Sequence, residues 1–428
     1  MNIITNFLNP PKLNEVFTPG GQPSVTYNDR SELGLEPALR KAVALGTTIV
    51  SLTGATKAGK TVLCRSVMNT YEYVWIDGGQ VKSEADLWAK VVSELRLPLE
   101  HEEAEGSEKE GRAEAKIGGD AGLLGTGVKF EFSAGGSRLR SYDSSRTYRL
   151  DGPSAAIEHM LANSIVLILD DFHYLDDAAR VGTIKSLKGA VFRGLKVILL
   201  STPYWAFEAI KAEPEITGRF KHVTVPDWSR EDLRKIAEAG FDALNVLCPR
   251  RIIEEFAKEA EGSPLLMQQF CWNLCYDNGI EAAKVSKHVI DPSFPTDRIY
   301  REVATDAGLP VYEKLKKGPQ TRTERIPRPL IAGGSVDIYQ AILLAIAATG
   351  PKEKLSYDQI RSSLNGLLSD KVPQKLEVSN ALNHLSAIDA ESNRGPRALD
   401  WNADDLELVL VDPFFRFYLR WEVAKAVS

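Results

Sequence analysis

The chain is organised around Gly54-Ala55-Thr56-Lys57-Ala58-Gly59-Lys60-Thr61, which matches the pattern G-x-x-x-x-G-K-[ST] at every fixed position. The apolar run 48–53 before it predicts a buried strand, and residues 62–68 after it predict a helix. Glycines let successive backbone N–H groups turn inward on a polyphosphate, and the start of the helix adds partial positive charge. A chance glycine turn does not require this order of strand, loop and helix. The stretch therefore predicts a loop that binds a nucleoside triphosphate.

The loop also predicts how ATP and Mg²⁺ are held. We expect Lys60 to reach the β- and γ-phosphates and the Thr61 hydroxyl to bind Mg²⁺. The other loop residues and the first residue of the helix are expected to bind phosphate through backbone N–H groups. They are Gly54, Ala55, Thr56, Lys57, Ala58, Gly59 and Val62.

A second apolar strand ends in two acids, about a hundred residues after the loop. It is Ile165-Val166-Leu167-Ile168-Leu169-Asp170-Asp171. We expect Asp170 to hold Mg²⁺ and Asp171 to orient the attacking water. The alternative is a solvated carboxylate pair at a strand end. Asp is shorter than the Glu usual at such sites, so we expect slow hydrolysis. His173 just beyond is expected to make a structural hydrogen bond.

Strands alternate with helices in the first half of the chain and predict an α/β fold with a parallel five-stranded sheet. The expected strands are 48–53, 73–77, 165–171, 197–202 and 222–225. Residues 1–228 are interpreted as the ATPase domain, opening with an extended lead-in, and residues 229–290 as an all-helical lid. Residues 291–335 are interpreted as a linker, and residues 336–428 as three helices followed by a two-stranded wing, a winged-helix domain.

One segment, residues 99–151, interrupts this pattern as an insertion. It opens acidic, becomes glycine-rich and ends with arginines and tyrosines interleaved. Such interleaving can contact nucleic acid. We favour the alternative, a mobile hairpin with solvated charges, because the segment is of low complexity.

Composition excludes some classes of partner. A formal net charge of −6 gives no overall attraction to nucleic acid or to anionic membrane. No apolar run is long enough to cross a bilayer, and the N-terminus lacks the features of a signal peptide. Four cysteines show no paired metal spacing and fit a reduced compartment, so we expect a cytoplasmic protein without membrane contact.

Together these motifs resemble the AAA+ superfamily, and within it the STAND signalling ATPases and their origin-recognition relatives. Tyr27-Asn28-Asp29-Arg30 resembles the family motif near the nucleotide base, with Asp29 in place of a glycine, and implies that Arg30 contacts the nucleotide. Ser201-Thr202-Pro203 resembles sensor 1, a polar group between the Mg²⁺ site and the γ-phosphate.

Three further positions follow from the resemblance. Arg219 occupies the place of the arginine finger, which acts on a neighbouring subunit. Gly262-Ser263-Pro264 resembles the STAND Gly-x-Pro motif, which implies that Pro264 packs by the adenine, and this triplet holds no sensor 2 arginine. Val411-Asp412-Pro413 lies where STAND proteins carry a His-Asp pair that clamps ADP, with valine replacing the histidine.

Two functions remain open from the sequence. The first is a nucleotide-driven switch that assembles as a homo-oligomer or signals to a separately encoded effector, by analogy with compact ATPases of bacterial defence systems. The second is a DNA-acting AAA+ ATPase, such as a transposition regulator or an initiator. Helix 375–384 is poor in cations and argues against DNA, whereas the basic stretch 314–328 could bind phosphate. A small-molecule kinase is disfavoured, because a lid followed by a winged helix offers no obvious substrate pocket.

Overall fold

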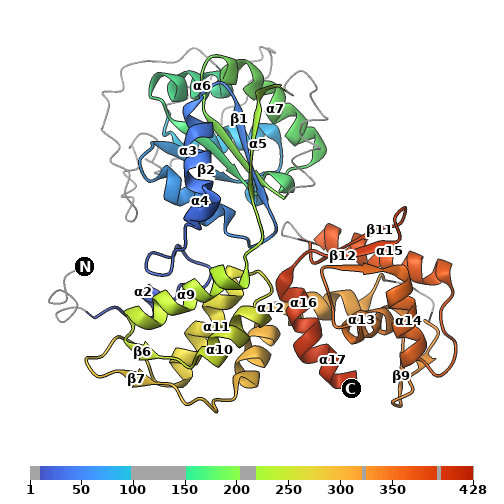
Figure 1. Ribbon diagram of the computed structural model, residues 1–428. Coiled ribbons are helices and arrows are strands. Elements are labelled where there is room, and N and C mark those ends of the chain that lie inside the picture. The colour runs from blue at the N-terminus through green and yellow to red at the C-terminus, as the bar shows by residue number, and fades with distance from the viewer. Residues whose placement is uncertain (1–9, 98–150, 203–217, 321–323, 393–396, 428) are drawn as a thin grey trace, which may run out of the picture.

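The computed structural model describes residues 10–97, 151–202, 218–320, 324–392 and 397–427 (Figure 1). The expected insertion 99–151 therefore lies almost wholly outside the described residues, as does the helix expected before the fifth strand. Within the described residues, no helix is long and apolar enough to cross a membrane.

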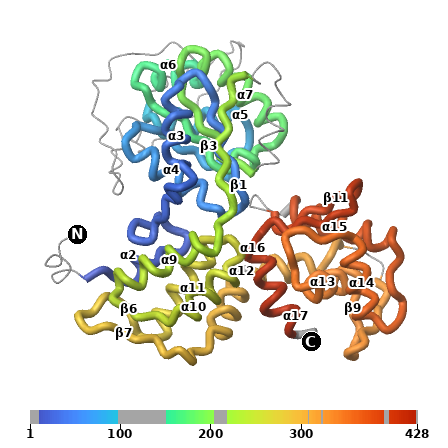
Figure 2. Tube along the Cα trace, viewed as in Figure 1, coloured from blue at the N-terminus to red at the C-terminus, as the bar shows by residue number. Residues whose placement is uncertain are grey.

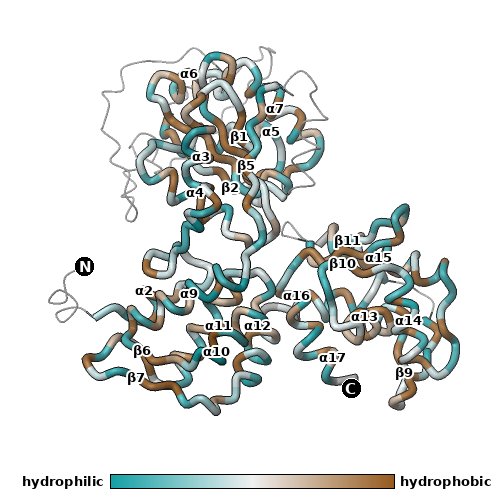
Figure 3. The backbone as a smooth tube through the Cα atoms, viewed as in Figure 1, coloured by the Kyte–Doolittle hydropathy of each residue, from teal (hydrophilic) through white to brown (hydrophobic). Residues whose placement is uncertain are grey.

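A parallel sheet of five strands forms the core of the N-terminal part of the chain, as the alternation of strands and helices predicted. Its order is β2-β3-β4-β1-β5. The strands are β1 (Ile49–Gly54), β2 (Tyr73–Asp77), β3 (Val166–Asp170), β4 (Val197–Ser201) and β5 (Phe220–Val225). The central strands β1, β3 and β4 are buried along their whole length, which is why they read as continuous apolar runs (Figure 3).

Helices cover both faces of this sheet. One face packs against α5 (Glu84–Glu94), α6 (Gly152–Ala162) and α7 (Asp177–Phe192). The other face packs against α3 (Leu35–Ala44) and α4 (Lys60–Met68). Because all five strands are parallel, their carboxyl ends meet at one edge, and the loops after β1, β3 and β4 lie there together.

The lid follows the fifth strand. It contains α9 (Arg230–Ala243), α10 (Arg250–Glu259) and α11 (Pro264–Asp277). The expectation of helices only was incomplete, because β6 (Val246–Leu247) and β7 (His288–Val289) form a small parallel pair.

Residues 291–335 differ from the expected linker. They contain α12 (Thr296–Lys317), a 22-residue helix with Pro310 inside it, and the short hairpin of β8 (Arg328–Pro329) and β9 (Ser335–Val336). Gly308 is a packing residue rather than a break, because a Cβ there would lie 2.1 Å from the Cβ of Tyr418. Helix α12 thereby packs closely on the end of the winged-helix domain.

The winged-helix arrangement is present as expected. Its helices are α13 (Ile338–Ala348), α14 (Tyr357–Leu367) and α15 (Lys375–Ser392). Strands β11 (Leu399–Asn402) and β12 (Glu407–Leu410) form the wing, with β10 (Lys354–Ser356) as a third strand beside β12. The chain then continues into α16 (Pro413–Tyr418), a π-helical turn (Leu419–Val423) and α17 (Ala424–Val427).

The lead-in before α3 is not simply extended. It forms the short helix α2 (Leu13–Val16), which packs on the lid rather than on the sheet (Figure 2). The Leu13 N–H donates to the Glu281 carbonyl, and the ring of Phe17 fills the space where Gly240 of α9 has no side chain. The chain then crosses from the lid to the sheet before α3 begins.

Candidate nucleotide site

The phosphate-loop sequence forms a tight loop between β1 and α4. Gly54 must be glycine because a Cβ there would lie 2.7 Å from the Val225 carbonyl oxygen of β5. Lys57 and Gly59 both have positive φ, at 62° and 90°. The loop leads directly into α4, whose first residue is Lys60, so a helix follows the loop as the motif predicted.

Lys60 points into the loop and is buried. Its Nζ donates to the Gly54 carbonyl at 3.0 Å and to the Ala55 carbonyl at 2.8 Å. Burial lowers the Lys60 pKa, and the carboxylates of Asp171 and Asp170 oppose that shift. A buried ammonium held by two carbonyls of its own loop is placed to exchange them for phosphate oxygens, which carry full negative charge.

The acids after β3 lie beside the start of α4. The Thr61 hydroxyl donates to Asp170 Oδ2 at 3.0 Å, and the Asp171 N–H donates to Asp170 Oδ1 at 2.9 Å. A hydroxyl and a carboxylate in contact are oxygen donors of the kind that Mg²⁺ takes alongside waters and phosphate oxygens. These residues therefore fit a magnesium ion. The described residues contain no cluster of three or more His, Cys, Asp or Glu side chains that could hold a metal on their own.

Asp171 has the chemistry of a general base. Burial raises its pKa to about 6, and the neighbouring charge of Asp170 adds to the rise. Its φ of 51° is left-handed, a conformation that Asp tolerates better than most residues. Gly78 makes room for this turn, because a Cβ there would lie 2.5 Å from the Asp171 carbonyl oxygen.

His173 does not show the expected structural hydrogen bond at Nδ1, which is buried with no partner among the described residues. Its ring packs against Tyr174 at 4.2 Å between centroids, and both residues line the cavity described below. Burial lowers the His173 pKa to about 4, so the imidazole is neutral at physiological pH.

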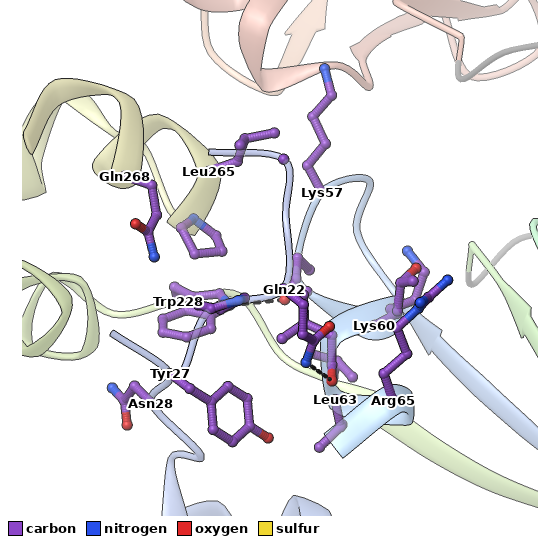
Figure 4. A pocket seen from close by; sticks show the side chains of 18 of the residues that line it. Gln22, Tyr27, Asn28, Lys57, Lys60, Leu63, Arg65, Trp228, Leu265 and Gln268 are labelled. Carbon is purple, nitrogen blue, oxygen red and sulfur yellow. Dashed lines mark hydrogen bonds between the residues drawn. The ribbon is translucent and has the colours of Figure 1, made fainter. Parts of the chain in front are cut away.

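A cavity of about 580 Å³ extends from the loop and Asp171 to the lid. Its far end is lined by aromatic, apolar and amide groups from the lead-in and the lid, labelled in Figure 4 except for Pro264: Tyr27, Asn28, Trp228, Pro264, Leu265 and Gln268. Pro264 is the first residue of α11 and lines this end of the cavity. Mostly apolar walls with a few fixed polar groups are typical of a nucleobase pocket.

Trp228 is the residue of this site that sequence reasoning missed. Its Nε1 donates to the Ala58 carbonyl of the phosphate loop at 2.9 Å (Figure 4). Only its position, a lone tryptophan between the last strand and the first lid helix, could have pointed to it. Trp228 joins the lid connection directly to the loop.

Arg30 lines the same cavity, but its guanidinium points to the backbone that connects β5 to α9. Its guanidinium donates to the Pro226 carbonyl at 3.0 Å and to the Asp227 carbonyl at 3.1 Å, and it covers the Trp228 ring at 4.5 Å. Arg30 therefore fixes the connection between β5 and α9 and orients the indole.

The remaining candidate residues lie at opposite ends of the parallel strands. Ser201 ends β4 beside Thr53 and is buried, and Thr202 lines the nucleotide cavity. Arg219 lies at the opposite edge, since its neighbour Phe220 pairs with Ile49 at the start of β1. The Arg219 guanidinium covers the ring of Phe192 at 4.8 Å.

The winged-helix domain also touches the phosphate loop. Lys57 Nζ lies 2.8 Å and 3.0 Å from the two carboxylate oxygens of Asp412, and 3.9 Å from the centroid of the Phe414 ring. Figure 4 shows the Lys57 side chain pointing away from the cavity toward that domain. Asp412 also caps α16 by accepting from the Phe414 N–H at 2.9 Å.

Comparison with known proteins gives similarity in structure only. No family model matches the chain, and no curated protein matches it. A Walker-type ATPase of Pyrococcus abyssi has a TM-score of 0.51 at 15% identity, covering 90% of this chain and 94% of that one. The ORC2 protein of Aeropyrum pernix has a TM-score of 0.47 at 12% identity, with 93% of each chain covered. Cdc6p of Pyrobaculum aerophilum has a TM-score of 0.43 at 11% identity, with 97% and 99% covered. The chain therefore shares the fold of that Walker-type ATPase: a parallel five-stranded sheet with a phosphate-binding loop, followed by helices and a winged-helix-like domain.

Proposed function

We propose that this chain binds ATP with Mg²⁺, hydrolyses it slowly, and acts as a nucleotide-dependent switch that signals to a separate partner protein. One observation carries the proposal: Lys60, Thr61, Asp170 and Asp171 converge at one end of a cavity whose other end fits a nucleobase. The cavity lies between the sheet and the lid, so nucleotide binding acts on the arrangement of these two parts.

ATP fits this cavity in one orientation. The base occupies the end lined by Tyr27, Trp228 and Pro264, and the phosphates extend to the loop and to Lys60. The metal supplies positive charge to the phosphate oxygens, with Thr61 and Asp170 holding it.

Asp171 takes the proton of the water that attacks the terminal phosphate, and Thr202, which lines the same cavity, orients that water. With its pKa raised to about 6, Asp171 is ionised at neutral pH and still basic enough to accept a proton.

The position of Arg219 supports action on a neighbouring subunit. It lies at the start of β5, whereas its own loop follows the far end of β1, so a six-residue strand separates them by roughly 20 Å. In a homo-oligomer the same arginine could reach the next subunit's γ-phosphate. Arg219→Ala should then bind ATP without turnover, and mixing it with a Lys60→Ala variant should restore some activity once sizing shows that the two co-assemble. Full activity of a monomeric Arg219→Ala variant would exclude this arrangement.

Three described cations of the basic stretch 314–328 are already paired with carboxylates, which weakens the case for the DNA-acting alternative. Lys316 pairs with Glu313 at 3.2 Å, Arg325 pairs with Asp337, and Arg328 pairs with Glu377 at 2.9 Å. Cations already paired with carboxylates release fewer counterions on binding DNA. We therefore favour a protein partner, and DNA is one arm of the test below.

The test is nucleotide binding and particle size. Calorimetry should show ADP and a non-hydrolysable ATP analogue binding to the wild type and not to Lys60→Ala, which removes the lysine that points into the loop. Lys41→Ala is the matched control, because this exposed lysine of α3 is not among the described residues that line the cavity. Sizing with each nucleotide, with and without DNA, then identifies the assembly. Unchanged nucleotide affinity in a folded Lys60→Ala protein would refute the proposal.

A further inference from the structure

Tyr27 is the aromatic side chain that the lead-in contributes to the base end of the nucleotide cavity. Figure 4 shows its ring on the same side of the cavity as Trp228, with the hydroxyl directed away from the indole. That hydroxyl donates to Oε1 of Glu36 at 2.7 Å, and Glu36 lies in the first turn of α3. A ring that is anchored through its hydroxyl as well as its Cβ has little freedom to turn, so the position of Glu36 fixes the position of the ring.

Glu36 is itself held by α4. The Ser66 hydroxyl donates to the same Oε1 at 2.7 Å, and Arg40 Nη2 lies 3.8 Å from Oε2. Arg40 also donates to the Val67 carbonyl of α4 at 3.2 Å. Burial disfavours the charge on Glu36, but hydrogen bonds from Ser66 and Tyr27 outweigh it and lower the Glu36 pKa. Glu36 is therefore a carboxylate at neutral pH, and the hydrogen bonds that it accepts are charge-assisted.

Helix α4 begins at the phosphate loop with Lys60 and carries Ser66 further along. One carboxylate oxygen of Glu36 thus joins the wall of the base pocket to the helix that starts at the phosphates. The ribose of a nucleotide limits the distance between its base and its phosphates. A protein that already holds both binding groups at that separation does not pay to order them when the ligand arrives.

The two neighbours of Tyr27 are bound to the lid instead of the sheet. Gln268 Nε2 of α11 donates to the Thr26 hydroxyl oxygen at 2.7 Å, and Asn28 Nδ2 donates to the Asp232 carbonyl of α9 at 3.2 Å. Side chains along this stretch therefore alternate between the two walls of the cavity. The hydrogen bond from the Tyr27 hydroxyl ties the stretch to the sheet side.

We infer that Glu36 is a positioning residue of the nucleotide site, which holds the Tyr27 ring against the nucleobase at a fixed distance from the phosphate loop. This inference rests on the proposed function, because it requires a nucleotide in the cavity. Removing Glu36 then weakens the binding of a ligand that has a base and spares a ligand that consists of phosphates alone.

The test compares ADP with inorganic tripolyphosphate, each with Mg²⁺, by calorimetry on the full chain. Glu36→Ala should weaken ADP binding about fivefold and change tripolyphosphate binding less than about twofold, on the scale of one lost hydrogen bond. Glu36→Gln should recover part of the ADP affinity, because its amide oxygen still accepts from the Tyr27 hydroxyl. Glu94→Ala is the matched control: this exposed carboxylate of α5 is not among the described residues that line the cavity, so both affinities should be unchanged.

A double variant separates positioning from a general loss of structure. Tyr27→Phe keeps the ring and removes the hydroxyl, so it should also weaken ADP binding and spare tripolyphosphate. If Glu36 acts through that hydroxyl, adding Tyr27→Phe to Glu36→Ala should weaken ADP binding by less than about a further twofold. If Glu36→Ala does not fold, as judged by circular dichroism, Tyr27→Phe alone carries the same expectation for the two ligands.

Different failures have different meanings. A wild-type protein that does not bind ADP would overturn the proposed function. A wild type that binds ADP would leave the proposed function standing, and three results would then overturn this inference alone. They are an unchanged ADP affinity in Glu36→Ala, an equal weakening of both ligands, and losses that add in the double variant. If the wild type does not bind tripolyphosphate measurably, the double variant decides on ADP affinity.

Discussion

Replacing Asp171 with asparagine should stabilise the nucleotide-free protein while abolishing turnover. Asp171 ionises with a pKa raised from 3.8 to about 6, because it is largely buried beside Asp170. Above pH 6 the folded protein must keep this unfavourable charge. Asparagine has the same shape, tolerates the left-handed φ of 51° at this position and carries no charge.

The magnitude follows from the shift in pKa. A rise from 3.8 to about 6 costs at most about 3 kcal/mol of folding stability at pH 8, at 1.36 kcal/mol per unit. Partial exposure of the side chain reduces this figure, so we expect a gain of about 1–3 kcal/mol. The folded state binds the Asp171 proton more tightly than the unfolded state does, and this sets the sign of the pH dependence of stability. Stability is therefore lost as pH rises from about 4 to 6, and the gain from Asp171→Asn should fall to about half at pH 5.

The assay is urea unfolding in EDTA at pH 8 and pH 5, with ATP turnover measured alongside at pH 8. Asp176→Asn is the control: Asp176 caps α7 outside the cavity, asparagine keeps the cap acceptor, and turnover should be unchanged. No gain for Asp171→Asn at pH 8, or the same gain at both pH values, would refute the electrostatic reasoning. Wild-type turnover in Asp171→Asn would place the general base elsewhere.

Two further predictions concern the loops around the site. Gly78→Ala should reduce ATP turnover and lower the free energy of unfolding by about 1–3 kcal/mol, because the added Cβ would clash with the turn that carries Asp171. Gly189→Ala is the control: its Cβ would have no atom within 4 Å, and the change should stabilise α7 by about 1 kcal/mol. Equal effects of the two changes, measured by urea unfolding and ATPase assay, would contradict this. Lys57→Met and Asp412→Asn should show a coupling energy of about 1–2 kcal/mol in a double-mutant cycle, since this half-buried pair is bidentate. Additive effects would mean that the pair contributes nothing.

The parts of the fold that were predictable are those set by local pattern. The phosphate loop, the two acids after β3 and the alternation of strands and helices all depend on residues close together in the sequence. Such local structure can be predicted from a single sequence, because the residues that form it are close together in the chain.

What could not be predicted depends on contacts between distant residues. Lys57 and Asp412 are 355 residues apart, and no spacing rule connects them. Gly308 lies in the stretch expected to be a linker, and its partner Tyr418 could not be known from the sequence, although this glycine is what allows α12 to pack there. The lead-in gave no sign that Phe17 would fill a space on the lid. Each of these residues has an ordinary type, and only the fold gives it a role.

The division of the hydrophobic cores explains why the nucleotide can act on the domain arrangement. One continuous core joins the lid, α12 and the winged-helix domain, with Phe270 of α11, Tyr300 of α12 and Phe417 of α16 in mutual ring contact. Moving the winged helix off the lid would expose this core, at about 25 cal/mol for each Å² of apolar surface. The sheet has its own cores on its two faces.

The sheet and the lid–winged-helix unit meet instead through polar contacts at the phosphate loop. They include the Trp228 indole on the Ala58 carbonyl and the Lys57–Asp412 pair. Such contacts can be exchanged for phosphate oxygens at small net cost, because one charged or hydrogen-bonded partner replaces another. The proposed switch therefore moves the lid and winged helix together, about the connection that Arg30 fixes after β5. A nucleotide that changes the charge at the loop acts at a junction that none of the described hydrophobic cores crosses.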